Sequence, residues 1–482
     1  MKSINIYKIA FLFVGITMMS TSCKKWLDTN KDPNLLEQSK ATVQLTLPTA
    51  EYTISYVLGN RYAELGGFLS QYWTQLPSAT QYYDYDRYSF DAADANREWN
   101  QLYAGALKDL NFIVSKGSAD GDSNYVAAAK VLQAYTFQLV SDVHGDVPFS
   151  EALQAQSGTL APHYDKQKAI YAGCVKLIDD ANMLWSDDAK KAITTEDVLF
   201  GGDLDMWKKF ANTLKLKLAV RQSGANSAEA ISILAELSGA SFLEGTDVAS
   251  IKFYEVKGNQ NPLYASIQGI GVDNNVASKA IADSINGWGD PRAAAFFDEA
   301  TFGGAGINGT QQGAAAFGGY SSSSPRSSLS STVLGKTTPV ILMSGWESKF
   351  LQSEAKANGW LAGGTTAQED YEDAIVSNMS FFGIDTTGLD LFAAAPYAWD
   401  TDPLNNVQQI AIQKWVAFCG TQNMESWIEL RRMGYPVLLP SKATQLGLLF
   451  PQRIPYVDGE IASNPNCPAQ LPITDKMWWD IN

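Results

Sequence analysis

Histidine, cysteine and basic residues are scarce in this chain, and each scarcity excludes a class of function. The 482 residues include only two histidines, His144 and His163, which leaves almost no material for histidine-ligated metals or histidine general bases. The 36 basic residues are outnumbered by 51 acidic ones, and the net charge of −15 would repel nucleic-acid backbones. No HExxH, GxSxG or CxxC motif occurs, and no apolar run reaches the length of a transmembrane helix. The sequence therefore predicts a binding protein without a metal or other cofactor and without nucleic-acid contacts, in preference to an enzyme.

Aromatic residues, in contrast, are abundant, with 13 Trp, 21 Tyr and 21 Phe. The densest group lies between Gln71 and Trp99, where the segment Tyr82–Arg87 is too polar for a buried strand and too aromatic for an ordinary loop. Large rings beside hydrogen-bonding groups suit stacking on sugars, whose apolar C–H faces meet the ring while their hydroxyls meet the polar groups. Any single ring is more often part of a core, but the segment as a whole predicts a binding surface. The candidate ligand-binding residues are Trp73, Tyr82, Tyr83, Tyr85, Trp288 and Tyr320, with Asp86 and Arg87 as polar partners.

The N-terminus has the pattern of a lipoprotein signal. Lys2 and Lys8 precede an apolar stretch over 9–19, which is too short to span a membrane and ends in small residues before Cys23. We therefore expect residues 1–22 to be a signal peptide and Cys23 to be acylated, in preference to an ordinary signal peptide with an incidental cysteine. Residues 23–48 would then form a lipid-anchored tether, so that the membrane is contacted through the lipid alone.

Two local features allow chemistry that we do not favour. Beyond Cys23 the cysteines are Cys174, Cys419 and Cys467, of which Cys419 and Cys467 are the most plausible disulfide, although three free, buried thiols are the preferred interpretation. The segment 28–34 spaces oxygen ligands as a calcium loop does, but Pro33 replaces the turn glycine and no glutamate stands at the twelfth position. The sequence therefore predicts no metal site there.

Most of the chain shows the periodicity of amphipathic helices. Apolar residues recur at helical spacing over 128–139 and 207–218. Adjacent helical segments have the length of hairpins of about 34 residues, so we expect a mainly α fold with a tetratricopeptide-like helical-hairpin scaffold. Within a domain covering 49–482, the scaffold would comprise about 49–239 and 339–482, and the Gly-, Ala- and Ser-rich part 240–338 would be an inserted irregular, loop-rich region facing the ligand. Further helices are expected near 50–75, 95–115, 164–184, 227–237, 341–358, 367–381, 405–419 and 424–433.

Four charged residues share predicted helix faces with apolar side chains. Glu347 and Glu354 lie on the apolar face of one helix, Lys414 on that of a second and Arg431 on that of a third. An isolated buried ion costs several kcal/mol or more, so these charges need partners. We expect Glu347 or Glu354 to pair with Lys414 or Arg431 inside the scaffold, as a structural ion pair and not as a catalytic one.

Four segments, in this order and spacing, resemble the SusD/RagB family. The first, Gly145–Phe149, is similar to the Gly-Asp-Val-Pro-aromatic segment of that family. With Cys23 and the tether, the resemblance spans essentially the whole mature chain. The other segments are Glu347–Ala355; Ile412–Trp415 with Glu425–Trp427 and Arg431–Pro436; and Arg453–Tyr456 with Glu460 and Asn464.

The resemblance implies a non-catalytic outer-membrane lipoprotein of Bacteroidetes that faces the cell exterior, captures oligosaccharides and delivers them to a SusC-like TonB-dependent transporter. Two alternatives stay open, a peptide-binding lid of the same type of transporter and a lipid-anchored glycoside hydrolase that uses a carboxylate pair. Outward display rests on the resemblance alone, because Lys24 and Lys25 stand where the family tends to have acidic residues. Binding-site aromatics are not fixed in position in this family, so the candidate residues rest on composition.

Overall fold

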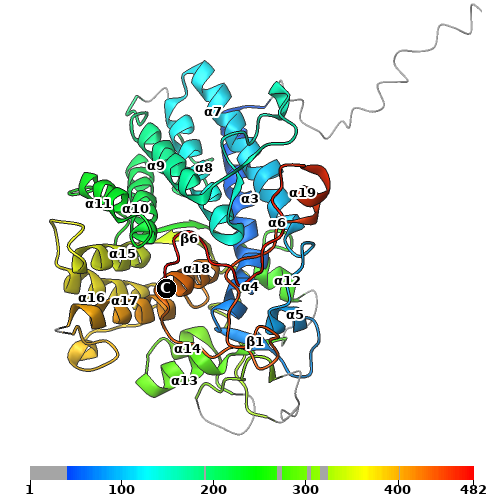
Figure 1. The fold of residues 1–482 in the computed structure, drawn as a ribbon. Helices are drawn as coiled ribbons and strands as arrows, with labels where there is room; N and C mark the ends of the chain where they lie inside the picture. Colours follow the sequence, from blue (N-terminus) through cyan, green and yellow to red (C-terminus); the bar gives the residue numbers. More distant parts are fainter. Residues whose placement is uncertain (1–40, 189–191, 269–273, 301–305, 315–323, 401) are drawn as a thin grey trace, which may run out of the picture. The chain divides into compact units, whose positions relative to one another are not determined.

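Paired helices make up most of the described structure (Figure 1). The computed structural model describes residues 41–188, 192–268, 274–300, 306–314, 324–400 and 402–482, and all elements belong to the compact unit Val43–Asn482. The mainly α fold of helical hairpins is thereby confirmed. The main packed pairs are α3 (Val43–Val57) with α7 (Lys108–Asp120), α8 (Ser123–His144) with α9 (Gln167–Asn182), α10 (Leu204–Gln222) with α11 (Ser227–Glu236), α15 (Gly345–Ala357) with α16 (Ala367–Phe381), and α17 (Pro403–Phe418) with α18 (Asn423–Met433).

Shorter elements connect and extend these pairs. Some of the predictions made for the N-terminus and the loop-rich region, namely residues 1–22, Cys23, segment 28–34 and Tyr320, lie outside the described residues. The remaining helical elements are η3 (Leu58–Tyr62), α4 (Ala63–Leu69), α5 (Tyr83–Arg87), α6 (Asn96–Asn100), η4 (Gln101–Leu107), η5 (Ala155–Ser157), α12 (Pro262–Gln268), α13 (Lys279–Trp288), α14 (Ala293–Phe296), η8 (Leu391–Ala393) and α19 (Asp458–Ser463). The strands are β1 (Trp73–Gln75), β2 (Val147–Pro148), β3 (Tyr164–Asp165), β4 (Val248–Ile251), β5 (Asn275–Ala277) and β6 (Val340–Ser344).

The helices form where apolar periodicity coincides with N-terminal caps. In α10 the side chain of Asp203 accepts hydrogen bonds from the amides of Asp205 and Met206, and in α16 Thr366 and Glu369 form a capping box. The predicted apolar stripes over 128–139 and 207–218 are buried. Local caps and buried stripes thus agree, which explains why the longer helices could be predicted.

Three boundaries differ from the prediction. The helix α3 begins at Val43, inside the segment 23–48 that we expected to be a tether. Burial of Val43 and Leu47 outweighs the backbone hydrogen bond that Pro48 cannot make. In the part 240–338, which we expected to be loop-rich, the described residues include β4, β5, α12, α13 and α14. The C-terminal part 435–482 contains only α19 among its described elements, although we assigned it to the helical scaffold. Its residues are instead held by single side-chain and backbone hydrogen bonds, as between Ile454 N–H and the carbonyl of Val143 at 2.9 Å.

The structure also bears on the prediction that the three cysteines beyond Cys23 are free thiols. Cys174 and Cys419 are buried free thiols, and Cys467 is free and half-buried. No disulfide joins Cys419 and Cys467, so the preferred interpretation of free thiols is confirmed, with Cys467 less enclosed than expected.

Substituting the glycine at the contact between α4 and α18 is expected to destabilise the fold. A Cβ atom on Gly66 would lie 2.6 Å from the backbone oxygen of Asn423, and backbone cannot move aside as a side chain can. We expect Gly66→Ala to lower the free energy of unfolding by about 1–3 kcal/mol, measured by denaturant titration.

The matched control is Gly287→Ala in α13. No heavy atom lies within 4 Å of the added methyl group there, and alanine favours the helix by about 0.5–1 kcal/mol over glycine. Equal effects of the two substitutions would contradict the close contact between α4 and α18.

Candidate functional site

The aromatic segment 71–99 meets a distant part of the chain in one small sheet. Strand β1 pairs antiparallel with β5, with Trp73 opposite Ala277 and Gln75 opposite Asn275. Bridges from Ser278 to Thr310 and from Val276 to Ser328 extend this sheet into the irregular part. Figure 1 shows β1, α5, α13 and α14 at the same end of the molecule. Segments 200 positions apart in the sequence thus lie side by side. We call the surface formed by α5, β1, β5 and α13 the α5 face.

Three of the candidate rings on this face are buried. Trp73 is fully buried, and its indole N–H donates to the carbonyl of Glu64 at 3.2 Å. Tyr82 and Tyr85 are also buried and stack on each other, with ring centroids 5.7 Å apart, against Phe68. Their ring faces are occupied by the core, so these three residues have no surface for a ligand in this structure. The choice of these rings from composition alone was wrong in that respect.

Asp86 was expected to face a ligand, but its carboxylate forms hydrogen bonds inside the protein. Its carboxylate is buried and accepts hydrogen bonds from the hydroxyl of Thr74 at 2.8 Å and the amide of Gly313 at 3.2 Å. Burial raises the pKa of Asp86 to about 6, while these hydrogen bonds act in the opposite direction. Asp86 therefore fastens segment 306–314 to the end of α5 and does not face solvent.

Tyr83 and Arg87 lie on the outer side of α5. Tyr83 is half-buried and Arg87 is exposed, and the guanidinium lies 4.9 Å from the centroid of the Tyr83 ring. Residues four apart are neighbours on a helix, and a cation over an aromatic face is attractive. The arrangement holds the ring and a fork of hydrogen-bond donors side by side at the surface.

The remaining candidates lie on adjoining segments. Trp288 is half-buried at the end of α13, whose N-cap residue Ser278 directly follows β5. Asn274, which the sequence reasoning missed, donates from its side-chain amide to the exposed Gln81 at 3.0 Å. Its position directly before the strand Asn275–Ala277 was the available signal. The α5 face thus offers a ring, a guanidinium and two amides.

The charged residues predicted to lie in the core are buried, but their partners differ from those expected. Glu347 pairs with Lys217 at 2.6 Å, Glu354 with Arg432 at 2.6 Å and Lys414 with Glu429 at 2.7 Å. Arg431 donates to the carbonyl oxygens of Asp142 and Gln452, and its guanidinium lies 3.7 Å from the centroid of the Trp427 ring. The expected pairing of Glu347 or Glu354 with Lys414 or Arg431 was therefore wrong. The prediction omitted the residues that supply the partners, which are Lys217 of α10 and Glu429 and Arg432 of α18.

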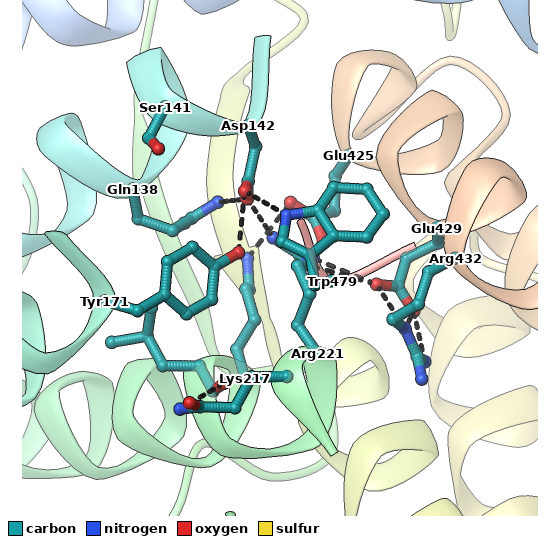
Figure 2. A network of polar contacts seen from close by, with 12 residues as sticks. Gln138, Ser141, Asp142, Tyr171, Lys217, Arg221, Glu425, Glu429, Arg432 and Trp479 are labelled. Carbon is teal, nitrogen blue, oxygen red and sulfur yellow. Dashed lines mark hydrogen bonds and ion pairs between the residues drawn. The ribbon is translucent and has the colours of Figure 1, made fainter. Parts of the chain in front are cut away.

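Asp142 and Arg221 join these pairs into one network between α8, α10 and α18. Figure 2 shows Gln138, Tyr171, Arg221 and Trp479 directed at the carboxylate of Asp142. Arg221 also pairs with Glu429 at 3.0 Å and with Glu425. Although burial acts to raise it, the charges of Arg432, Lys414 and Arg221 hold the pKa of Glu429 well below its usual value. Because these charges are partnered in the interior, the network stabilises the scaffold.

Paired helices that support an irregular, aromatic-bearing face define a ligand-binding scaffold. The chain belongs to the SusD-like family: residues 33–457 match the family model described as starch-binding and associating with the outer membrane. The proteins of this family are binding proteins and not enzymes. None of the helices in the described ranges combines the length and apolar character of a membrane-spanning segment.

Solved structures share this fold over nearly their full length. A chitin-binding protein is 25% identical, with 90% of this chain and 100% of that chain covered and a TM-score of 0.75. A chitin-binding SusD homologue from Flavobacterium johnsoniae is 22% identical, with 91% and 99% covered and a TM-score of 0.79. A SusD homologue from Bacteroides uniformis is 21% identical, with 91% and 99% covered and a TM-score of 0.73. The comparison with curated proteins finds no match.

Proposed function

We propose that this protein captures oligosaccharides on the α5 face and delivers them to a SusC-like TonB-dependent transporter, while acylated Cys23 anchors it at the exterior of the outer membrane. The observation that carries the proposal is the surface pair Tyr83–Arg87 beside the amides of Gln81 and Asn274. A ring face suits the C–H side of a sugar, and the guanidinium and amides suit its hydroxyls. The similarity to two chitin-binding proteins favours chitooligosaccharides as the first ligands to test.

Calorimetric titration tests the ligand class. The mature chain would be titrated with chitooligosaccharides, malto-oligosaccharides, and neutral and basic peptides, the last because the net charge of −15 would attract them. Binding of a sugar series supports the proposal, and binding of peptides alone would replace it with a peptide-capturing lid. Co-purification of the lipidated chain with a large barrel protein from outer-membrane extracts tests the delivery step.

Removing the half-buried Tyr83 ring is expected to weaken sugar binding. We expect Tyr83→Ala to raise the Kd for the bound oligosaccharide about tenfold, which corresponds to about 1.4 kcal/mol of lost stacking. Tyr83→Phe keeps the ring and should bind within about threefold of the wild type. Met183→Ala, an exposed apolar residue after α9, serves as the control at a distant surface. Equal Kd values for all three variants would exclude Tyr83 from the site.

A further inference from the structure

A large cleft lies away from the α5 face. It has a volume of about 990 Å³, near the upper end of ligand pockets, which span about 300–1,000 Å³. The cleft lies between the first half of α3, the segment 195–206, and β4 with the turn that follows it, and Tyr52, Val198, Phe200, Phe253 and Tyr254 contribute to its lining. None of its lining residues belongs to β1, α5, β5 or α13, so it is separate from the site already described.

Two unusually exposed tyrosine rings lie at the rim of this cleft. Tyr254 is 63% exposed and Tyr52 is 41% exposed, and these are the two most exposed aromatic side chains among the residues that the structure describes. Both line the same cleft, and the Tyr52 ring packs against Phe253 with centroids 6.2 Å apart. Exposed large rings that gather at one concave surface mark binding sites.

The walls of the cleft are held in place by hydrogen bonds. The carboxylate of Asp197 accepts from the amides of Leu199, Phe200 and Gly202 at 3.0–3.1 Å and from the indole of Trp207 at 2.8 Å. On the opposite side, Tyr254 N–H donates to the carbonyl of Asn259 at 2.8 Å, which closes the turn that carries the exposed ring. A site built in advance loses little entropy when a ligand binds.

The cleft wall has little charge of its own. Glu51, between the lining residues Thr49 and Tyr52, is fully buried; its Oε2 accepts from the amide of Val198 at 2.9 Å. Its Oε1 has no hydrogen-bond partner in the described part of the chain. Burial, followed by the negative charge of Asp197, raises the pKa of Glu51 well above its usual value, which favours the neutral form of this carboxyl. Among the lining residues, Asn259, Ser250 and Thr195 add neutral hydrogen-bonding groups, and Lys252 is the one cation. Asp197 is the one acid of the lining, and its carboxylate is buried and accepts the hydrogen bonds named above.

We infer that this cleft is a second carbohydrate-binding site, which takes a neutral oligosaccharide between the rings of Tyr52 and Tyr254. Exposed rings with neutral polar groups match a polyhydroxylated, uncharged chain better than a peptide, which would bring charged termini or side chains. The ligand class rests on the proposed capture of glycans at the α5 face. Two sites on one rigid protein would bind a long glycan more tightly than either site binds a short one, provided that the glycan spans both.

The test compares variants at the two sites with short and long chitooligosaccharides in calorimetric titration. The wild type should bind two short oligosaccharides per chain. Tyr254→Ala should reduce this number to one, leave the Kd of the remaining site within about twofold, and weaken the long oligosaccharide at least about tenfold. Val256→Ala is the matched control, because Val256 is 66% exposed in the same turn but does not line the cleft. Tyr254 supports no core contact that would endanger folding, given its exposure.

The outcomes separate the two proposals. A wild type that binds no sugar at all overturns glycan capture and the second site together. One sugar per wild-type chain, removed by Tyr83→Ala and unaffected by Tyr254→Ala, supports capture at the α5 face and overturns the second site. Peptide binding that Tyr254→Ala abolishes, without a second sugar, likewise overturns the carbohydrate assignment of the cleft. If Tyr83→Ala still binds sugar and the double variant Tyr83→Ala, Tyr254→Ala does not, the result supports the second carbohydrate-binding site.

Discussion

Arg221→Met is expected to lower the free energy of unfolding by about 3–5 kcal/mol, the cost of removing one member of a buried ion network. The Arg221 side chain is 1% exposed and pairs with three carboxylates, those of Asp142, Glu425 and Glu429. Methionine fills most of the volume but supplies no charge, so Asp142 and Glu425 would each keep fewer donors in a low-dielectric interior. Denaturant titration of the mature chain at pH 7 measures the loss.

The matched control is an ion pair at the surface. Lys166 pairs with Asp146 at 2.7 Å, but its side chain is 83% exposed, and such pairs contribute about 0–1 kcal/mol. Lys166→Met should therefore change the stability by less than about 0.5 kcal/mol. If Arg221→Met and Lys166→Met had similar effects, the interior network would not be a principal support of the helical scaffold.

Burial of charges could be predicted from the sequence, but their partners could not. Helical periodicity placed Glu347, Glu354, Lys414 and Arg431 on apolar faces, and all four are buried. The choice of partner depends on which helix packs beside which, and this is a property of the whole fold. Lys217 of α10 lies 130 positions before Glu347 and yet provides its salt bridge. Local patterns carry no information on such a pairing.

The candidate site could likewise be predicted only in part from local sequence patterns. Composition predicted an aromatic binding surface in the segment 71–99, and β1 brings this segment against β5, which lies 200 positions further along the chain. Which rings point outward follows from the phase of α5, a helix of five residues that we did not predict from the sequence. Spacing at 3.6 residues places Tyr82, Tyr85 and Asp86 inward and Tyr83 and Arg87 outward. A helical reading of this short segment would have separated the two groups.

His144 is expected to make stability depend on pH between about 4 and 6.5. The imidazole is 1% exposed, and its Nδ1 lies 3.0 Å from the carbonyl oxygen of Pro455, while the Nε2 atom has no hydrogen-bond partner within the described ranges. Burial lowers the pKa of His144 to about 4, against about 6.5 in the unfolded chain. Above pH 6.5 both states hold a neutral ring. As the pH falls from 6.5 towards 4 only the unfolded state gains the proton, so stability decreases, by about 3 kcal/mol in total.

Other titratable groups change the stability in the opposite direction as the pH falls. The effect of His144 must therefore be measured as a difference between the wild type and a variant. Burial raises the pKa of Asp86 to about 6; the folded state then binds this proton first, and stability rises as the pH falls towards the unfolded value. Subtracting the pH profile of His144→Gln from that of the wild type cancels Asp86 and leaves the imidazole. We expect this difference to change by about 2–3 kcal/mol between pH 7 and pH 4.5, with the wild type losing more.

Because the chain contains only two histidines, NMR can follow the protonation of His144 directly. With His144 and His163 as the two imidazoles of the chain, NMR spectra contain two sets of ring signals, and a His163→Gln variant assigns them. In the folded protein the His144 signals should stay at their neutral positions down to about pH 5, because the ring is enclosed by Trp99, with centroids 5.3 Å apart, and by the backbone of Ile454 and Pro455. A His144 titration midpoint near 6.5 in the folded state would contradict this enclosure.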